Sequence, residues 1–234
     1  MAHKKHLQIA QLLTKITFCI GVIISFTITK IHAQAVNIEW QQVYGGSSTD
    51  GAYDIDATAD GGYITGGYSY SGISGNKTAT NYGDSDFWVV KTDSVGNIEW
   101  QKTYGGSAFE QVETLSQTAD GGYILGGYSV SGISGNKTEA NVAGSIDLWI
   151  VKIDASGNIT WQNAIGGNGS DYLGSIYPTA DGGYIVGAYS FSGISGDKTE
   201  AVVGFSADYW TLKLNSSGNI VWQNTIGGTG NDYC

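Results

Sequence analysis

Two tryptophans recur along this chain at an interval of 60 or 61 residues, and this interval constrains the fold more than any other feature. One series comprises Trp40, Trp100, Trp161 and Trp222, and the other comprises Trp88, Trp149 and Trp210. These are all seven tryptophans of the chain. An Asp-Gly-Gly-Tyr string keeps the same interval, beginning at Asp60, Asp120 and Asp181. A fixed period of this size predicts stacked copies of one supersecondary unit rather than a single irregular domain.

Each repeat contains four strand signals and no helical one. In the first repeat we expect strands at residues 53–58, 62–69, 86–92 and 97–104. The Asp60-Gly61 pair predicts a type I′ turn between the first two strands, and Gly96 stands at the left-handed bulge position of the last turn. Four strands per repeat are typical of a β-propeller blade, so we expect an all-β propeller with about 60–61 residues per blade.

The third strand of each repeat is apolar on both faces. In the first copy Phe87 and Val89 point to one side, and Trp88 and Val90 point to the other. A strand of a two-layer sandwich buries only one face, so this pattern favours blades packed face to face. The fourth strand alternates and is expected at an outer, half-exposed edge. The glycines inside the second strands, expected to make room for a neighbouring Trp or Tyr ring, are Gly66, Gly126 and Gly187.

Residues 1–35 have the pattern of an export signal. A lysine-containing stretch precedes an apolar run from Ile16 to Ile28, and Ala33 and Ala35 offer alternative cleavage positions. The alternative is a membrane anchor, but the run of 13 residues is shorter than the roughly 17–25 that a spanning helix needs. We therefore expect a secreted or outer-surface protein with no membrane span once the signal is removed.

Removal of residues 1–35 would change the chemistry available to the chain. The removed segment contains all three histidines and four of the 11 lysines but no acidic residue. The remaining chain has seven lysines, no arginine and 21 acidic residues, so its net charge is near −14. The one remaining cysteine is Cys234. This inventory excludes Ser-His-Asp and Cys-His catalysis, a histidine-ligated metal and a disulfide framework. It also argues against nucleic acid or an anionic membrane as partner, and we expect no cofactor.

The repeat boundaries give the expected domain organisation, a signal segment at 1–35 followed by β-propeller repeats at 36–234. Within the repeats we expect a lead strand at 36–46, blades at 47–106, 107–167 and 168–228, and the start of a truncated repeat at 229–234. Three blades are fewer than the four to eight of a closed propeller, so the pattern indicates a fragment of a longer ring. The alternative is a short protein that forms an open arc or assembles with other copies.

Four motifs follow one another in every repeat. They are Trp-x4-Gly-Gly-x3-acid, Asp-Gly-Gly-Tyr-Ile-x-Gly-x-Tyr-Ser, Asp-x-Trp-x-x-Lys and Gly-Asn-Ile-x-Trp. In this combination, over about residues 37–234, the chain resembles the bacterial β-propeller repeats of the SBBP type and the related delta-60 repeats. The resemblance implies a secreted or surface protein of a Gram-negative bacterium, of the kind often exported by a type IX system with a C-terminal sorting domain. No sorting domain is evident in the sequence, and the resemblance implies no catalytic residue.

The recurring charged residues admit a catalytic and a structural interpretation. An acid follows each glycine pair by four residues, at Asp50, Glu110, Asp171 and Asp232, and a lysine follows each Trp-containing strand, at Lys91, Lys152 and Lys213. Paired carboxylates could perform acid–base chemistry on a glycoside. Catalytic carboxylates normally differ in environment, however, whereas these copies are equivalent by repetition. We therefore expect the acids to cap turns or to pair with lysines, and we assign the repeated Trp, Lys and Asp-Gly-Gly residues to the structure.

Two types of recurring loop have compositions that resemble binding sites. The Asp93-x-x-Gly-Asn97 turn and its copy at Asp154 are too short for calcium, which takes six to eight oxygen ligands, so turn chemistry explains them. The loop at 71–78, 131–138 and 192–199 lacks the spacing of a phosphate-binding loop. We expect it to form either a plain rim or part of a ligand-binding rim. The candidate rim residues are Tyr70, Tyr82, Phe191, Asn76, Asn136 and Asp197.

The sequence thus predicts a non-enzymatic β-propeller scaffold for binding or adhesion at the cell surface or outside the cell. The alternative is a carbohydrate-binding module or a non-catalytic appendage of a glycoside-active protein. A glycoside hydrolase working through Asp and Glu ranks third. The expected partner is a protein or a glycan that the sequence does not name.

Overall fold

The computed structural model describes residues 37–143, 146–204 and 206–233, in which all regular secondary structure is β-strand. The predicted export signal at 1–35 lies outside these residues. Within them, no helix that could cross a membrane is found. The twelve described strands all lie within Trp40–Cys234.

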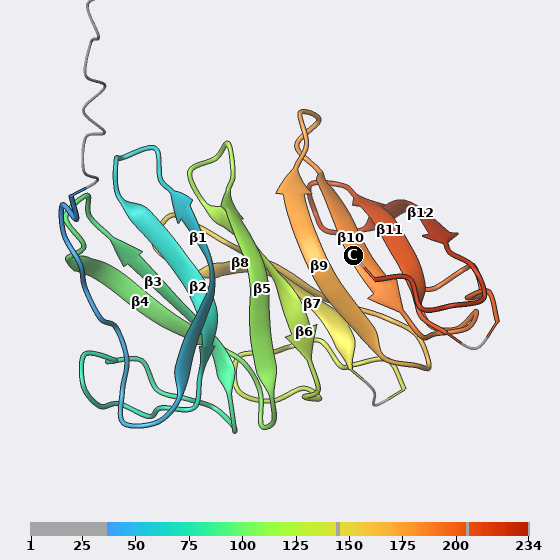
Figure 1. Ribbon diagram of the computed structural model, residues 1–234, viewed down its shortest axis with the longest axis horizontal. Helices are drawn as coiled ribbons and strands as arrows, with labels where there is room; N and C mark the ends of the chain where they lie inside the picture. The colour runs from blue at the N-terminus through green and yellow to red at the C-terminus, as the bar shows by residue number, and fades with distance from the viewer. Residues whose placement is uncertain (1–36, 144–145, 205, 234) are drawn as a thin grey trace, which may run out of the picture. The chain divides into compact units, whose positions relative to one another are not determined.

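The strands form three four-stranded antiparallel sheets (Figure 1). The first sheet contains β1 (Asp50–Ala57), β2 (Tyr63–Ser69), β3 (Asp86–Thr92) and β4 (Ile98–Tyr104). The second contains β5 (Glu110–Gln117), β6 (Tyr123–Ser129), β7 (Asp147–Ile153) and β8 (Ile159–Ile165). The third contains β9 (Asp171–Pro178), β10 (Tyr184–Ser190), β11 (Asp208–Leu214) and β12 (Ile220–Ile226).

Each sheet is a simple meander in which sequential strands are neighbours. The all-β class and the four strands per repeat are confirmed. The described strands form no closed ring, so the propeller itself stays a prediction. Successive first strands contact one another, β1 with β5 and β5 with β9, and all three lie at the front of Figure 1. The fourth strands lie at the opposite sheet edges, where most residues of β4 and β8 are partly exposed, as expected.

The first hairpin turn differs from the predicted type. Gly61 has φ +85°, but Asp60 does not have a positive φ, which a type I′ turn would require. Instead the Gly61 amide donates to the Thr58 carbonyl at 2.9 Å and the Thr58 amide donates to the Gly62 carbonyl at 2.9 Å. This is a three-residue loop with a glycine bulge. The aspartate side chain favours it, because Asp60 Oδ1 accepts from the Gly62 amide at 3.0 Å. The predicted glycine bulge at Gly96, with φ +83°, is confirmed.

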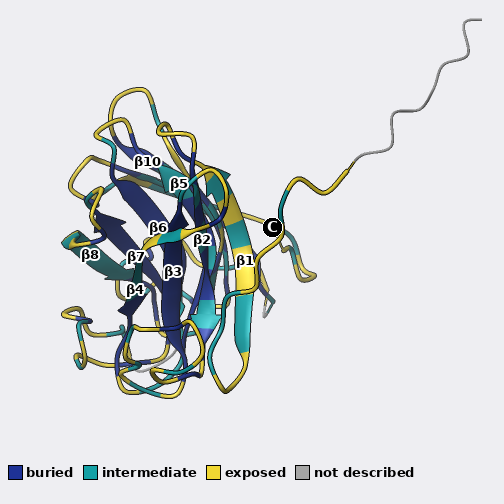
Figure 2. Ribbon diagram, turned by 90° about the vertical axis from the view of Figure 1, so that its left-hand side faces the viewer, coloured by how far each residue is buried: buried dark blue, intermediate teal, exposed yellow. Residues whose placement is uncertain are grey.

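The third strands are the most deeply buried elements. Every residue of β3 and of β7 is buried, as the apolar pattern on both faces predicted (Figure 2). In the third sheet β11 is only partly covered, and its Tyr209 is exposed. Among the described residues, β7 has a sheet on each side, β3 has a sheet on one side and the segment 37–46 on the other, and β11 has a sheet on one side only.

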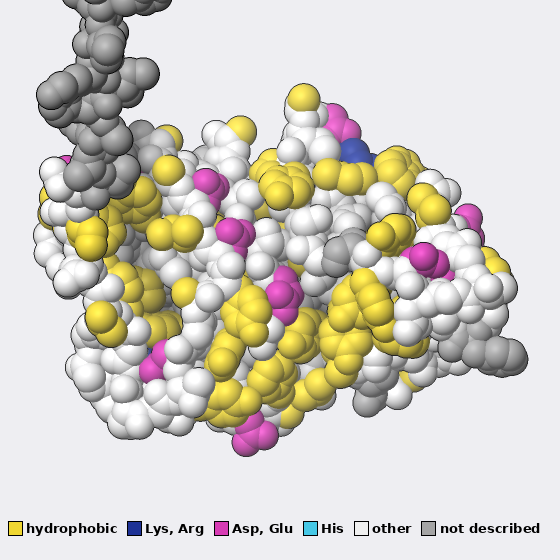
Figure 3. Space-filling view, viewed as in Figure 1, with side chains coloured by type: hydrophobic (Ala, Val, Ile, Leu, Met, Phe, Trp, Pro, Cys, Tyr) yellow, Lys and Arg dark blue, Asp and Glu magenta, His cyan; other side chains and the backbone are white. Residues whose placement is uncertain are grey.

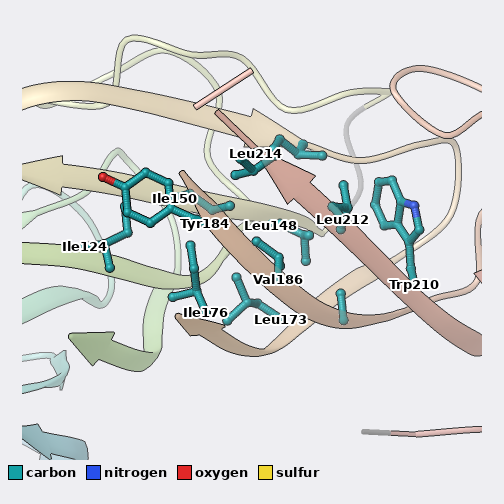
Figure 4. Close-up of a cluster of buried hydrophobic side chains, with 12 residues drawn as sticks. Ile124, Leu148, Ile150, Leu173, Ile176, Tyr184, Val186, Trp210, Leu212 and Leu214 are labelled. Carbon is teal, nitrogen blue, oxygen red and sulfur yellow. The ribbon is translucent and has the colours of Figure 1, made fainter. Parts of the chain in front are cut away.

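Apolar side chains fill the space between successive sheets. Between the first and second sheets, the rings of Phe87 and Trp149 lie 4.7 Å apart, centroid to centroid. Between the second and third, Figure 4 shows the side chains of one continuous cluster. Its members include Ile124, Leu148, Ile150, Leu173, Ile176, Val186, Trp210, Leu212 and Leu214. The core is therefore a series of sheet-to-sheet layers, as expected for blades packed face to face.

The glycines inside the second strands make room for aliphatic side chains, not for the predicted aromatic rings. A Cβ atom at Gly66 would lie 2.6 Å from a Leu115 methyl group of the next sheet. At Gly126 it would lie 2.9 Å from both Ile176 and Leu173. Because these side chains come from the first strand of the next sheet, only a residue without a side chain allows that strand to approach. Gly187, in the third sheet, would meet only the Ser175 hydroxyl, at 3.1 Å.

The lead segment was predicted as a strand at 36–46, and this is wrong, since residues 37–46 form no strand. The segment nevertheless reproduces the contacts of a fourth strand. The Trp40 ring lies 5.7 Å from the Tyr63 ring, as Trp100 lies 6.1 Å from Tyr123. It lacks strand structure because no third strand is present beside it among the described residues.

We predict that Gly126→Ala and Gly187→Ala differ in cost although they change the same position of the repeat. Gly126→Ala forces a methyl group against Ile176 and Leu173, and overpacking of this kind lowers the free energy of unfolding by about 1–3 kcal/mol. Gly187→Ala meets only a rotatable hydroxyl and should change it by about 0.5 kcal/mol or less. Urea denaturation monitored by Trp fluorescence measures both. Equal losses would contradict the proposed packing.

Candidate functional site

The recurring acids cap the glycine pairs. The amide of the second glycine donates to the acid four residues later, at 2.7 Å for Asp50, 2.7 Å for Glu110, 2.8 Å for Asp171 and 2.9 Å for Asp232. Serine hydroxyls complete the arrangement, for example Ser129 Oγ, which donates to Glu110 Oε1 at 2.7 Å. Glu110 and Asp171 are fully buried. These carboxylates hold the chain where it passes from one sheet to the next.

The strand lysines pair with the acids of the first hairpin turn. The Nζ to carboxylate distances are 2.9 Å for Lys91–Asp60, 2.9 Å for Lys152–Asp120 and 3.0 Å for Lys213–Asp181. Hydrogen bonds from Thr118 and then Lys152 lower the pKa of Asp120 to about 2. Each pair joins a turn to the third strand of the same sheet, which is a structural role.

The lysines of the recurring loop are buried and lie over tryptophan rings. Lys77, Lys137 and Lys198 are each 1% exposed. Their Nζ atoms lie 5.8, 5.8 and 5.0 Å from the centroids of Trp88, Trp149 and Trp210. Burial lowers the pKa of all three ammonium groups. A cation–π contact and hydrogen bonds, such as 2.9 Å from Lys77 Nζ to Asn81 Oδ1, hold the charge inside, so these lysines do not face a ligand.

The polar residues predicted for the rim are hydrogen-bonded to the backbone. Asn76 Oδ1 accepts from the Gly45 amide at 2.8 Å, and Asn76 Nδ2 donates to the Val43 carbonyl at 2.7 Å. Asn136 makes the matching pair of bonds, and Asp197 Oδ2 accepts from the Gly166 amide at 3.2 Å. All three side chains tie a loop to the glycine pair that precedes the first strand of the same sheet.

The Asp93 turn uses its carboxylate in the same local way. Asp93 Oδ1 accepts from the amides of Val95 at 3.0 Å and Asn97 at 2.8 Å. Among the described residues, no group of three or more His, Cys, Asp or Glu is placed to hold a metal ion.

The aromatic rim residues separate into two places. Tyr82 and Asn136 both line an open groove of about 470 Å³ beside β4. Tyr70 and Phe191 instead belong to a continuous aromatic strip, in which neighbouring ring centroids are 4.9–6.4 Å apart. The strip consists of Tyr53, Tyr68, Tyr70, Phe109, Tyr128, Tyr172, Tyr189, Phe191 and Tyr233. Figure 3 shows hydrophobic side chains gathered on this face, over β5 and β9.

Most of the strip departs from the repeat. Tyr68, Tyr128 and Tyr189 recur in every copy, whereas the other six rings stand at positions that are not aromatic in every copy. Tyr172 and Tyr233 share one such position, and Tyr70 and Phe191 share another. Tyr70, for example, corresponds to Val130 in the second repeat. A residue needed for the repeated core would be expected in every copy. The sequence signal that could have revealed the strip is therefore the presence of aromatic residues at positions that are not aromatic in every repeat.

Each first strand contains a β-bulge, and the bulged residue lies on the same face as the aromatic strip. The register against the second strand shifts at Tyr53 in β1, at Glu113 in β5 and at Gly174 in β9. A bulge turns a side chain out of the regular alternation. Tyr53 thereby reaches Tyr68, with centroids 5.8 Å apart. The three bulged positions carry a ring, a carboxylate and no side chain, so the repeat presents different chemistry at equivalent points.

The strip contains a partly buried carboxyl group. Gln111 Nε2 donates to Glu113 Oε1 at 2.6 Å. Burial raises the pKa of Glu113, and burial together with Glu113 raises the pKa of Tyr128. The six lysines at recurring positions are engaged in the ion pairs and loop contacts described above. The face can therefore offer apolar contact, phenolic hydroxyls and a carboxyl group, which suits an uncharged or cationic ligand better than an anion.

A second recurring acid begins each third strand, and the sequence analysis assigned it no role. Asp86, Asp147 and Asp208 are all 0% exposed. Asp86 Oδ2 accepts from the Tyr82 amide at 2.6 Å. Burial raises the pKa of Asp86 from 3.8 to about 7.

This buried acid predicts that stability falls as pH rises. Between pH 4 and 7 the folded state retains the Asp86 proton, whereas the unfolded chain releases it near the ordinary pKa of 3.8. The folded state then binds more protons, so the free energy of unfolding decreases with pH across this range and stays lower above it. Asp86→Asn keeps an acceptor for the Tyr82 amide and removes this dependence. The difference in free energy of unfolding between this variant and the wild type should therefore grow, in favour of the variant, by about 2 kcal/mol from pH 5 to pH 8.

Urea denaturation at pH 5, 6.5 and 8 measures the effect. Asp84→Asn removes an exposed carboxylate two residues earlier and is the matched control. Asp84→Asn should keep the wild-type dependence on pH. Identical pH profiles for Asp86→Asn and the wild type would show the interpretation of Asp86 to be wrong.

Comparison with known proteins does not identify a family for this chain. No protein-family model matches it, and no curated protein matches it significantly. The resemblance to SBBP-type repeats therefore stays a prediction from the motifs, and the function must be inferred from the residues themselves.

Proposed function

We propose that this protein is a secreted or cell-surface, non-enzymatic β-propeller scaffold that binds a partner through the aromatic strip. The observation that carries this proposal is the gathering of aromatic residues on one face of a repeated framework, most of them from positions that are not aromatic in every copy. Localisation outside the cell rests on the export-signal pattern of residues 1–35, and the propeller rests on the stacked four-stranded sheets.

The exposure of the strip supports a binding role. Tyr53, Tyr70, Phe191 and Tyr233 are between 41% and 51% exposed, and they lie beside five rings that are partly buried. Partly buried rings hold the exposed ones in place, which lowers the entropy lost when a partner binds. Tyrosine is also enriched among the residues that dominate binding energy in interfaces.

The recurring carboxylates support a non-enzymatic role. The acids that follow the glycine pairs accept backbone amide bonds, and those of the first hairpin turns pair with lysines. A general base needs a free lone pair within reach of a substrate. Glu110 and Asp171 are moreover 0% exposed, so a substrate cannot reach them in this structure.

Glycan binding is the second candidate, and the polar groups of the strip favour it. Glu113 and Gln111 lie next to the Tyr128 ring and could hydrogen-bond sugar hydroxyls while exposed rings stack on the apolar side of a sugar. A glycan-binding face would still belong to a non-enzymatic module. The two candidates differ in the class of ligand and share the same surface.

The test uses the double variant Tyr70→Ser/Phe191→Ser against the control Ile73→Ser/Ile194→Ser. The control isoleucines are 67% and 69% exposed in the same two loops but lie outside the strip. Wild type and variants are applied to a glycan array and to a peptide array. We expect binding at least about tenfold weaker for the strip variant, because aromatic hot spots contribute about 2 kcal/mol or more, and unchanged binding for the control.

The array that responds separates the two candidates. Signal on glycans alone supports a carbohydrate-binding module, and signal on peptides supports a scaffold for protein partners. Thermal unfolding of both double variants checks that they fold equally well. Equal binding by the strip variant and the wild type on a responding array would overturn the assignment of the strip.

A further inference from the structure

The same sheet-to-sheet interface occurs twice in this molecule, and each sheet contributes a different face to it. We call the face that meets the following sheet the trailing face, which in the first sheet carries Ile64, Phe87, Val89, Trp100 and Tyr104. We call the opposite face the leading face, which in the second sheet carries Val112, Leu115, Tyr123, Leu125, Trp149 and Val151. The interface is heterologous, since a trailing face always meets a leading face.

The trailing face of the third sheet is uncovered in this structure. Tyr209 is 39% exposed, whereas Phe87 and Leu148 at the same position are 0% exposed. Ile226 is 58% exposed, whereas Tyr104 and Ile165 are 2% exposed. Trp222, which corresponds to Trp100 and Trp161, is 43% exposed. Apolar positions that are buried in the internal interfaces are therefore exposed on the third sheet.

The leading face of the first sheet is incompletely covered. Ile55 is 60% exposed, whereas Leu115 and Ile176 at the same position are 2% and 0% exposed. A cavity of about 280 Å³ lies against this face and is lined by residues that include Val43, Ala52, Thr65, Trp88 and Val90. It occupies the place where the other two interfaces hold trailing-face side chains such as Phe87 and Leu148.

The lead segment covers the rest of this face in the way an outer strand would. Tyr44 Oη donates to the Gly96 carbonyl at 2.6 Å, and Tyr104 Oη of β4 donates to the Gly157 carbonyl at 2.7 Å. The Trp40 ring sits on Tyr63 as Trp161 sits on Tyr184, with centroids 5.7 Å apart in both pairs. The segment has no strand partner of its own, so a complete outer strand can compete for its place.

We propose that the trailing face of the third sheet docks on the leading face of the first sheet in a second copy of this chain. Tyr209 and Thr211 of one copy then fill the cavity beside Thr65 and Val90 of the next. Ile226 replaces Tyr44, and Trp222 replaces Trp40 over Tyr63. Continuity with the two internal interfaces selects this occupant, because the docked faces are further copies of surfaces that already bind each other. Two copies can close on themselves, and more can extend as a chain.

The two docking faces each carry a polar residue where the internal interfaces carry an apolar one, and this favours a reversible association. Thr65 stands where Leu125 and Val186 stand in the later sheets, and Thr211 stands where Val89 and Ile150 stand in the earlier ones. Such polar substitutions are typical of interfaces that form and separate. The chain also carries a net charge of −10, so copies repel one another at low salt and added salt should strengthen the association.

The test compares Ile226→Asp with Val221→Asp in the full chain by sedimentation velocity under reducing conditions. Val221 is 60% exposed on the same strand β12 but is not part of the trailing face, which makes it a matched control. Over about 1–100 µM and in 0.5 M salt, as suits a micromolar dissociation constant, the wild type and Val221→Asp should associate. Ile226→Asp should associate at least about tenfold more weakly. All variants carry the same first 36 residues, so a difference in association between Ile226→Asp and Val221→Asp reports on the trailing face alone.

Mixing distinguishes this head-to-tail contact from a symmetric one. Ile55→Asp disables the leading face and Ile226→Asp disables the trailing face, so neither variant should associate alone, whereas an equimolar mixture keeps one intact pair of faces and should form a dimer. A wild type that stays monomeric throughout, an equal loss in Val221→Asp, or a mixture without dimers would each overturn the proposal.

Trp40→Ala should strengthen association several-fold, because Trp40 then no longer competes with Trp222 of the second copy for the place over Tyr63. Weaker or unchanged association would overturn the exchange of Trp40 for Trp222.

Discussion

The fold depends on one constraint, the contact of each sheet with the apolar face of the next. A sheet whose third strand is apolar on both faces cannot be stable alone in water, since burial of apolar surface contributes about 25 cal/mol per Å². The second sheet, with a neighbour on each side, has a fully buried β7, whereas β11 in the third sheet remains partly exposed. The glycines at Gly66 and Gly126 let the sheets approach closely enough for Leu115, Leu173 and Ile176 to fill the layers.

Around this apolar stack, the recurring polar residues hold loops and turns in place. An acid caps each glycine pair, a lysine pairs with each Asp-Gly-Gly turn, and a loop lysine lies over each third-strand tryptophan. Such groups look like candidates for chemistry in the sequence, because they are charged and regularly spaced. Their regular spacing is explained by their structural contacts, which every repeat needs equally. Specific recognition is therefore more reasonably sought where the repeats differ, at the bulges and along the aromatic strip.

The sequence predicted the elements well and their three-dimensional neighbours less well. The expected strands at 62–69, 86–92 and 97–104 correspond closely to β2, β3 and β4, because apolar patterning and turn residues act locally. The turn at Asp60, the role of Gly66 and the conformation of the lead segment were predicted wrongly. The role of Gly66 and the conformation of the lead segment depend on distant groups, namely the first strand of the next sheet and the absence of a neighbouring strand. The turn depends on local hydrogen bonds of Thr58 and Asp60, which the Asp-Gly pair alone does not specify. Tyr70 and Phe191 were singled out as candidates, but the seven other rings of the strip were not, since they are separated along the chain and a bulge directs Tyr53 toward Tyr68.

The sequence by itself determined the all-β class, the repeat of about 60 residues, the four strands in each unit and the apolar character of both faces, because these follow from periodicity and local propensity. Only the tertiary structure decided which side chains remain available to a partner. It buried the loop lysines over tryptophans, tied Asn76 and Asn136 to the backbone, and gathered rings from three repeats into one strip. The physical reason is that exposure depends on what packs against a residue, and here those neighbours are brought together by folding, as when Lys77 lies over Trp88 and Asn76 bonds to Gly45.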